Sequence, residues 1–78
     1  MKKQDILNGL KEISKERNVK FDENSLNKPF KEIGIDSLTG ISMIMDVESK
    51  FGITIPDDKL TSIKNYAELI KMIETLIK

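Results

Sequence analysis

The chain of 78 residues contains no cysteine, no histidine and no tryptophan, and it has only two prolines. The absence of cysteine excludes disulfide bonds and thiolate ligands for a metal ion. The absence of histidine removes the most common general base and metal ligand, and with it any Ser-His-Asp arrangement. No apolar run approaches the roughly 20 residues that a membrane-spanning helix needs, and the basic start, residues 1–5, is not followed by the apolar segment of a signal peptide. We therefore expect a cytoplasmic protein that neither binds a metal nor inserts into a membrane.

The length is sufficient for one small domain, which we place at residues 1–78. The net charge is zero, but the charges are unevenly distributed along the chain. Residues 32–58 contain six acids and one base, a net charge of −5, whereas residues 1–31 carry +3 and residues 59–78 carry +2. An acidic centre suits a basic protein partner and argues against nucleic acid binding, although a solvated helix surface would show the same pattern.

Apolar residues recur at helical spacing in three stretches of the sequence. They predict helices over about Lys3–Arg17, Asp36–Phe51 and Asn65–Ile77. Pro56 followed by two aspartates predicts a further short helix at Asp57–Thr61. The sequence thus predicts an all-α fold, a small four-helix bundle with three long helices and one short one.

Residues 18–36 show no regular pattern, and so long a loop must be held onto the core by its own apolar side chains. The candidates for this role are Phe21, Leu26, Phe30 and Ile33.

The central predicted helix, Asp36–Phe51, is apolar over more of its circumference than a surface helix of a small bundle requires. Its apolar residues divide into two rows. One row contains Met43, Ile44, Val47 and Phe51, and the other contains Leu38, Ile41 and Met45. The first row should face the core. The second is either partly exposed as a binding surface or buried against a flanking helix, and the sequence leaves both alternatives open.

Ser37 stands at the start of this helix, after Asp36, a residue type favoured at a helix N-cap. A serine nucleophile needs a base within hydrogen-bond reach. Here there is no histidine, and Asp36 is an adjacent position that would not face the serine along a helix. We therefore expect no enzymatic activity. Ser37 is either a simple helix-start residue or an attachment point for a phosphodiester, whose negative charge a helix N-terminus favours.

Three segments at fixed spacing resemble the acyl carrier protein family. They are Phe30-Lys-Glu-Ile-Gly-Ile-Asp-Ser-Leu38, Met45-Asp-Val-Glu-Ser-Lys-Phe-Gly52 and Ile55-Pro-Asp-Asp58. The resemblance spans about residues 30–70, with a compatible first helix before it. Asp-Ser-Leu alone is a weak signal, whereas the same tripeptide followed by Glu-x-x-Phe and Ile-Pro-Asp at this spacing is a specific one.

The resemblance implies that Ser37 is the attachment site of a 4′-phosphopantetheine arm, within a motif that includes Asp36 and Leu38. A phosphopantetheinyl transferase would add the arm from coenzyme A, and the thiol of the arm would carry acyl groups as thioesters. The implied fold has three long helices and one short helix, which agrees with the pattern of the sequence.

The resemblance also implies a docking face on the second helix and the short third helix. This face would bind basic patches on acyl-transfer and chain-elongation enzymes. Its residues would be Leu38, Ile41, Met45, Asp46, Glu48, Asp57 and Asp58. The acyl chain would be sheltered in a cavity lined by Ile55, Leu60 and Ile63. We expect the carrier to be a monomer.

The chain also departs from the family pattern. Thr39, Ser42 and Ser49 stand where typical fatty-acid carriers have acids, and the chain is neutral where the family is strongly acidic. The carrier role depends on Ser37 and is unaffected by this difference, whereas the choice of partners is open. The alternatives are a carrier of fatty acid biosynthesis, a specialised carrier of a polyketide, peptide or other thioester pathway, and an unmodified helical interaction module.

Overall fold

The computed structural model describes residues 2–77, and its regular elements are all helical. The α-helices are α1 (Lys3–Glu16), α2 (Ser37–Phe51), α3 (Asp57–Leu60) and α4 (Tyr66–Leu76). Two 3₁₀ turns, η1 (Glu23–Ser25) and η2 (Phe30–Ile33), lie between α1 and α2. The predicted all-α fold with three long helices and one short helix is confirmed, and the helix boundaries differ from the predicted ones by only one or two residues.

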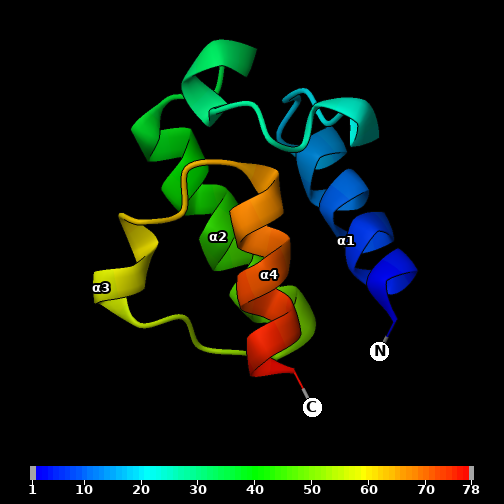
Figure 1. Cartoon of the computed structure of the whole chain (residues 1–78), viewed down its shortest axis with the longest axis vertical. Coiled ribbons are helices and arrows are strands. Elements are labelled where there is room, and N and C mark those ends of the chain that lie inside the picture. The colour runs from blue at the N-terminus through cyan, green and yellow to red at the C-terminus, as the bar shows by residue number, and fades with distance from the viewer. Residues whose placement is uncertain (1, 78) are drawn as a thin grey trace.

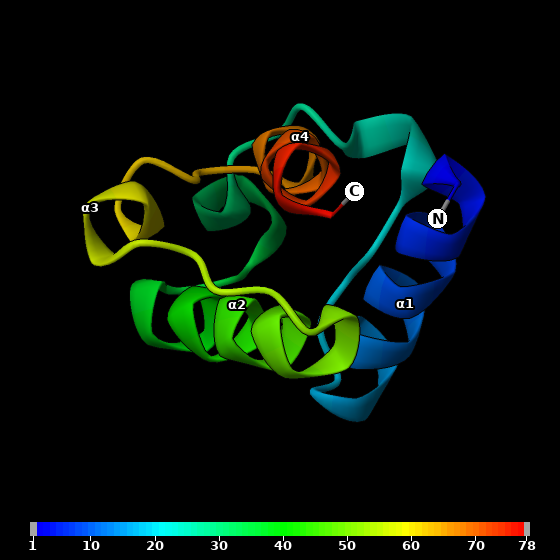
Figure 2. The same ribbon diagram turned by 90° about the horizontal axis from the view of Figure 1, so that it is seen from below.

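The helices surround one core (Figure 1). In Figure 2 the view runs along α4, with α1 and α3 on opposite sides and α2 between them. Within residues 2–77 no helix is long and apolar enough to cross a membrane. The core is made of buried apolar side chains from the three long helices and their connections. They are Ile6, Leu10, Ile13, Phe30, Ile35, Met43, Ile44, Val47, Ile55, Ile63, Tyr66, Leu69, Ile70 and Ile73.

The ends of α2 and α4 follow from local side-chain chemistry. Asp36 caps α2, because its carboxylate accepts a hydrogen bond of 2.8 Å from the Thr39 N–H. Gly52 ends α2 in the left-handed region, at φ 66°, which glycine adopts without steric cost. Asn65 caps α4 by accepting from the Glu68 N–H at 2.8 Å. Glu68 returns its own carboxylate to the Lys64 N–H at 3.1 Å, one residue before the cap.

The loop between α1 and α2 is held in place by the first turn of α4. Tyr66 is fully buried and stacks edge-to-face on Phe21 and Phe30, with ring centroids 4.7 and 5.0 Å away. Its hydroxyl donates a hydrogen bond of 2.8 Å to the Lys20 carbonyl. Phe30 is buried, and the other three loop side chains expected to pack on the core are partly buried against it. The loop is therefore part of the core, as the sequence predicts.

Sequence analysis expected no regular element between residues 18 and 36, whereas the structure places two 3₁₀ turns there. Turns of three and four residues are too short to leave a periodic apolar pattern. They are stabilised by contacts with distant residues. The Phe30 N–H donates to the Lys64 carbonyl at 2.8 Å, and the Ala67 N–H donates to the Leu26 carbonyl at 3.0 Å. Such long-range pairs cannot be found from local sequence alone.

Helices α1 and α2 approach closely where Gly9 faces the ring of Phe51. A Cβ atom added at Gly9 would lie 2.5 Å from Phe51 Cζ and 3.2 and 3.3 Å from the two Cε atoms. The side chain of Phe51 therefore occupies the space that any larger residue at position 9 would need.

Replacing Gly9 by alanine tests this contact. Alanine favours an α-helix over glycine by about 1 kcal/mol, but overpacking against the ring costs about 1–3 kcal/mol. We expect Gly9→Ala to lower the free energy of unfolding in the wild-type background. In a Phe51→Leu background, where the ring is absent, the same substitution should raise it by about 1 kcal/mol. Urea denaturation of the four proteins measures both changes, and equal changes in the two backgrounds would contradict the proposed contact.

Tyr66 makes stability sensitive to alkaline pH. Burial raises the pKa of Tyr66 from its usual 10.0 to about 12. Because the folded pKa lies above the unfolded one, this contribution is complete below pH 10.0 and is lost as the pH rises toward about 12. Near neutral pH, Tyr66→Phe should cost about 1 kcal/mol through loss of the hydrogen bond to Lys20. Denaturant titrations between neutral and strongly alkaline pH should show the advantage of wild type over Tyr66→Phe shrinking above pH 10.0. An advantage independent of pH would be inconsistent with a buried hydroxyl.

Candidate functional site

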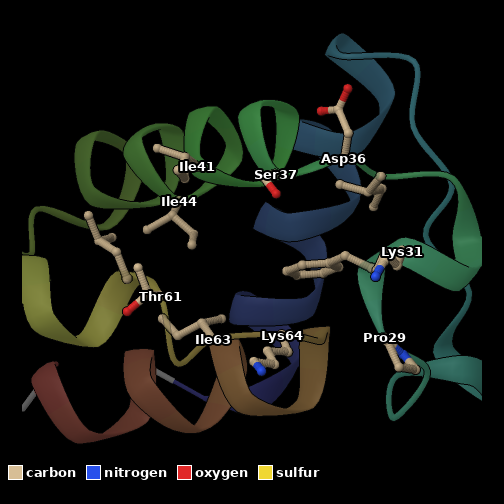
Figure 3. A pocket seen from close by; sticks show the side chains of 13 residues that line it. Pro29, Lys31, Asp36, Ser37, Ile41, Ile44, Thr61, Ile63 and Lys64 are labelled. Atoms are coloured by element: carbon tan, nitrogen blue, oxygen red, sulfur yellow. The ribbon is translucent and has the colours of Figure 1, made fainter.

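Ser37 is the first residue of α2 and is exposed to solvent. Figure 3 shows its hydroxyl directed into a pocket between the start of α2 and the segment that joins α3 to α4. The pocket has a volume of about 360 Å³. It is lined by Pro29, Phe30, Lys31, Ile35, Asp36, Ser37, Gly40, Ile41, Ile44, Leu60, Thr61, Ile63 and Lys64. A group attached to Ser37 would therefore begin at the rim of a largely apolar hollow.

The start of α2 favours a negative charge on Ser37. An α-helix leaves its first N–H groups without intrahelical partners and carries a partial positive charge at this end. Asp36 already uses one of these donors. The hydrogen bonds that it accepts from Thr39, first from the backbone N–H, hold the pKa of the Asp36 carboxyl below its usual 3.8. Asp36 therefore caps the helix as a carboxylate at neutral pH.

The arrangement lacks the parts of a nucleophilic catalyst. The Asp36 carboxylate is bound to the Thr39 N–H and points away from the pocket, so it is not oriented to take a proton from Ser37 (Figure 3). Among residues 2–77, no group of acidic side chains could hold a metal ion. The site can present an attached group, but it contains no general base that would activate the serine.

The second apolar row of α2 is exposed. Leu38 is 76% exposed, Met45 59% and Ile41 40%, whereas Met43, Ile44 and Val47 are buried and Phe51 is partly buried. Of the two alternatives that the sequence left open, the structure selects the partly exposed row. The row starts beside Ser37 and forms an apolar strip on the surface of α2.

Two acids that were predicted to dock partners have contacts inside the molecule. Asp46 forms a bidentate ion pair with Arg17 of α1, in which Arg17 Nη2 lies 3.2 Å from Asp46 Oδ1. Glu48 is partly buried, and its carboxylate accepts a hydrogen bond of 2.7 Å from the Ile55 N–H. By contrast, Asp57 and Asp58 are exposed in the first turn of α3. The sequence could not separate the two pairs, because the partners of Asp46 and Glu48 are brought to them by folding.

The residues predicted to line an acyl cavity are divided by the structure. Leu60 and Ile63 line the pocket that Ser37 faces, but Ile55 is not among its lining residues. Ile55 is buried in the core next to the connection that Glu48 holds. Sequence analysis missed Gly40 and Ile44 as lining residues and assigned Ile41 only to docking. Their spacing of three, four and seven residues from Ser37 was a usable signal, since such positions share one face of a helix.

Comparisons with known proteins agree with this site. Residues 8–73 match the model of the family described as "phosphopantetheine attachment site". An acyl carrier protein homolog of Mycoplasma pneumoniae is 46% identical over 79 residues, covering 99% of this chain and 94% of that protein. The acyl carrier protein of Exiguobacterium sibiricum is 37% identical, covering 99% of this chain and all of its own length.

Solved structures show the same fold. The crystal structure of an acyl carrier protein from Thermotoga maritima matches with a TM-score of 0.83 and 25% identity, covering 96% of this chain and 89% of that one. The solution structure of the 3,7-dioxo-octyl actinorhodin acyl carrier protein from Streptomyces coelicolor matches with a TM-score of 0.69 and 28% identity, covering 95% of this chain and 87% of that one. From its sequence relatives and its fold together, the chain belongs to the acyl carrier protein family, whose members are phosphopantetheine-bearing carriers rather than catalysts.

Proposed function

We propose that Ser37 bears the 4′-phosphopantetheine arm and that the chain carries acyl groups as thioesters on the thiol of that arm. The observation that carries the proposal is the placement of an exposed serine hydroxyl at the start of α2, facing a pocket. The positive end of the helix favours the phosphodiester at this position. Asp36 and Leu38 flank Ser37 and would contact the attached group. The apolar lining, with Leu60 and Ile63 at the far side, suits an acyl chain.

Removing the hydroxyl of Ser37 should abolish attachment. Wild-type apo protein, incubated with coenzyme A and a broad-specificity phosphopantetheinyl transferase, should gain the mass of one phosphopantetheine group. Ser37→Ala should gain none, because no oxygen is left to form the phosphodiester. Ser49→Ala, which removes an exposed serine hydroxyl at the other end of α2, is the matched control and should gain the full mass. Intact-mass spectrometry measures all three, and a mass gain on Ser37→Ala would refute the assignment.

We further propose that the exposed row of α2 and the start of α3 dock partner enzymes. Leu38, Ile41 and Met45 would bury apolar surface, while Asp57 and Asp58 would attract basic patches. The partners would be a phosphopantetheinyl transferase and the enzymes of acyl transfer and chain elongation. Asp46 and Glu48 would act mainly inside the carrier, because their carboxylates are held by Arg17 and the Ile55 N–H.

The pathway is proposed to be fatty acid biosynthesis, in a monomeric carrier whose single domain spans residues 1–78 in the cytoplasm. The alternative is a specialised carrier, and the threonine and serines at positions 39, 42 and 49 favour it, because they replace acids expected on a fatty-acid carrier. Intact-mass analysis of the protein from its native cells distinguishes the two. A ladder of saturated acyl chains of increasing length supports fatty acid synthesis, and a single unusual acyl group supports a dedicated pathway.

Truncating Leu38 should weaken docking without affecting the fold. Its side chain is 76% exposed, so Leu38→Ala should leave the thermal midpoint unchanged. Loss of its burial against a partner, worth about 1.4 kcal/mol, should lower kcat/KM for the transferase about tenfold. Thr54→Ala, which truncates an exposed side chain outside the row, should leave kcat/KM unchanged. If kcat/KM for Leu38→Ala equals that of wild type, the transferase does not dock on this row.

A further inference from the structure

Two lysines line the pocket that Ser37 faces. Lys31 belongs to η2, and Lys64 lies in the connection between α3 and α4. Figure 3 shows these two side chains and Ser37 around the same pocket, each from a different segment of the chain. The two lysine segments are joined directly, since the Phe30 N–H donates to the Lys64 carbonyl at 2.8 Å. Folding therefore brings two cations, 33 residues apart in the sequence, to the rim of one pocket.

The positive charge of this rim is not balanced within the described part of the chain. The ion pairs between residues 2 and 77 use Lys11, Arg17 and Lys50, and none uses Lys31 or Lys64. The one acid that lines the pocket is Asp36, whose carboxylate is occupied by the Thr39 N–H. A cleft lined by cations with low-dielectric walls concentrates its field and attracts an anion.

We propose that Lys31 and Lys64 bind the phosphodiester of the arm and thereby hold the start of the arm over the pocket. This inference rests on the proposed attachment at Ser37. The phosphodiester is the anion that lies beside Ser37 in every loaded state, so its effective concentration at the rim is high. A carboxylate at the end of an acyl group would have to be brought back along a flexible arm, at a cost in conformational entropy.

The pocket suits an arm held in this way. Below the lysines, its wall is formed by the aliphatic side chains of Ile41, Ile44, Leu60 and Ile63. An arm with its phosphodiester paired to the lysines would start across this wall instead of extending into solvent. The lysines would then restrain the arm between transfers, and a docking enzyme with its own basic patch would compete with them for the phosphodiester.

The test compares the thermal midpoints of apo and holo protein, with intact mass establishing the modification state of each sample. In low salt, attachment of the arm should raise the midpoint of wild type by about 2–4 °C, as expected for one or two exposed charge pairs in a domain of this size. The Lys31→Gln/Lys64→Gln double variant should show no rise. Each single variant should lose about half of it. Lys71→Gln, which removes one exposed cation from α4 outside this pocket, should keep the full rise.

Three further results separate the alternatives. High salt should erase the rise in wild type, because the Debye length falls to about 3 Å near 1 M. A full rise in the double variant overturns the proposal, since the helix N-terminus alone would then hold the phosphodiester. Arms loaded with an acetyl group and with an acyl group that ends in a carboxylate should give the same rise as the free thiol. A rise seen only with the carboxylate-bearing acyl group also overturns the proposal. Failure of wild type to gain mass would instead refute attachment at Ser37.

Discussion

The buried ring of Tyr66 couples the two halves of the molecule. It stands at the first turn of α4, stacks on Phe21 and Phe30, and donates its hydroxyl proton to the Lys20 carbonyl. The loop before α2 has few other ways to bury its backbone, and a buried polar group without a partner is costly. Once Phe30 is held by Tyr66, η2 forms one wall of the pocket beside Ser37. Presentation of the serine therefore depends on packing far from it in sequence.

Helix α2 serves two surfaces with one sequence. Its buried row of Met43, Ile44 and Val47 holds it to the core, which leaves the opposite row free to remain partly exposed beside Ser37. An exposed apolar strip has no stabilising role in the free carrier, and its presence is explained by a partner that covers it. The attached group would thus sit between an apolar pocket on one side and a docking strip on the other.

Charges in this carrier act within the molecule as well as toward partners. Arg17–Asp46 and Lys50–Glu12 join α1 to α2, and each exposed pair contributes no more than about 1 kcal/mol. Their larger consequence is to reduce the acidity that α2 offers to other proteins. Glu48 likewise holds the connection before α3. Partner recognition would then depend more on apolar contact and on Asp57 and Asp58 than an inspection of acidic residues suggests.

The sequence by itself determined the helices, the cap at Asp36 and the serine motif, because these depend on apolar periodicity and on neighbours within a few residues. It also identified Phe30 and Leu60 as buried or lining residues from their apolar character. Only the tertiary structure decided which row of α2 is exposed, that Asp46 and Glu48 are engaged internally, that Ile55 lies outside the pocket, and that Lys31 and Lys64 share its rim. Each of these depends on pairs of residues separated by a loop or a helix, whose distances are fixed only when the core closes.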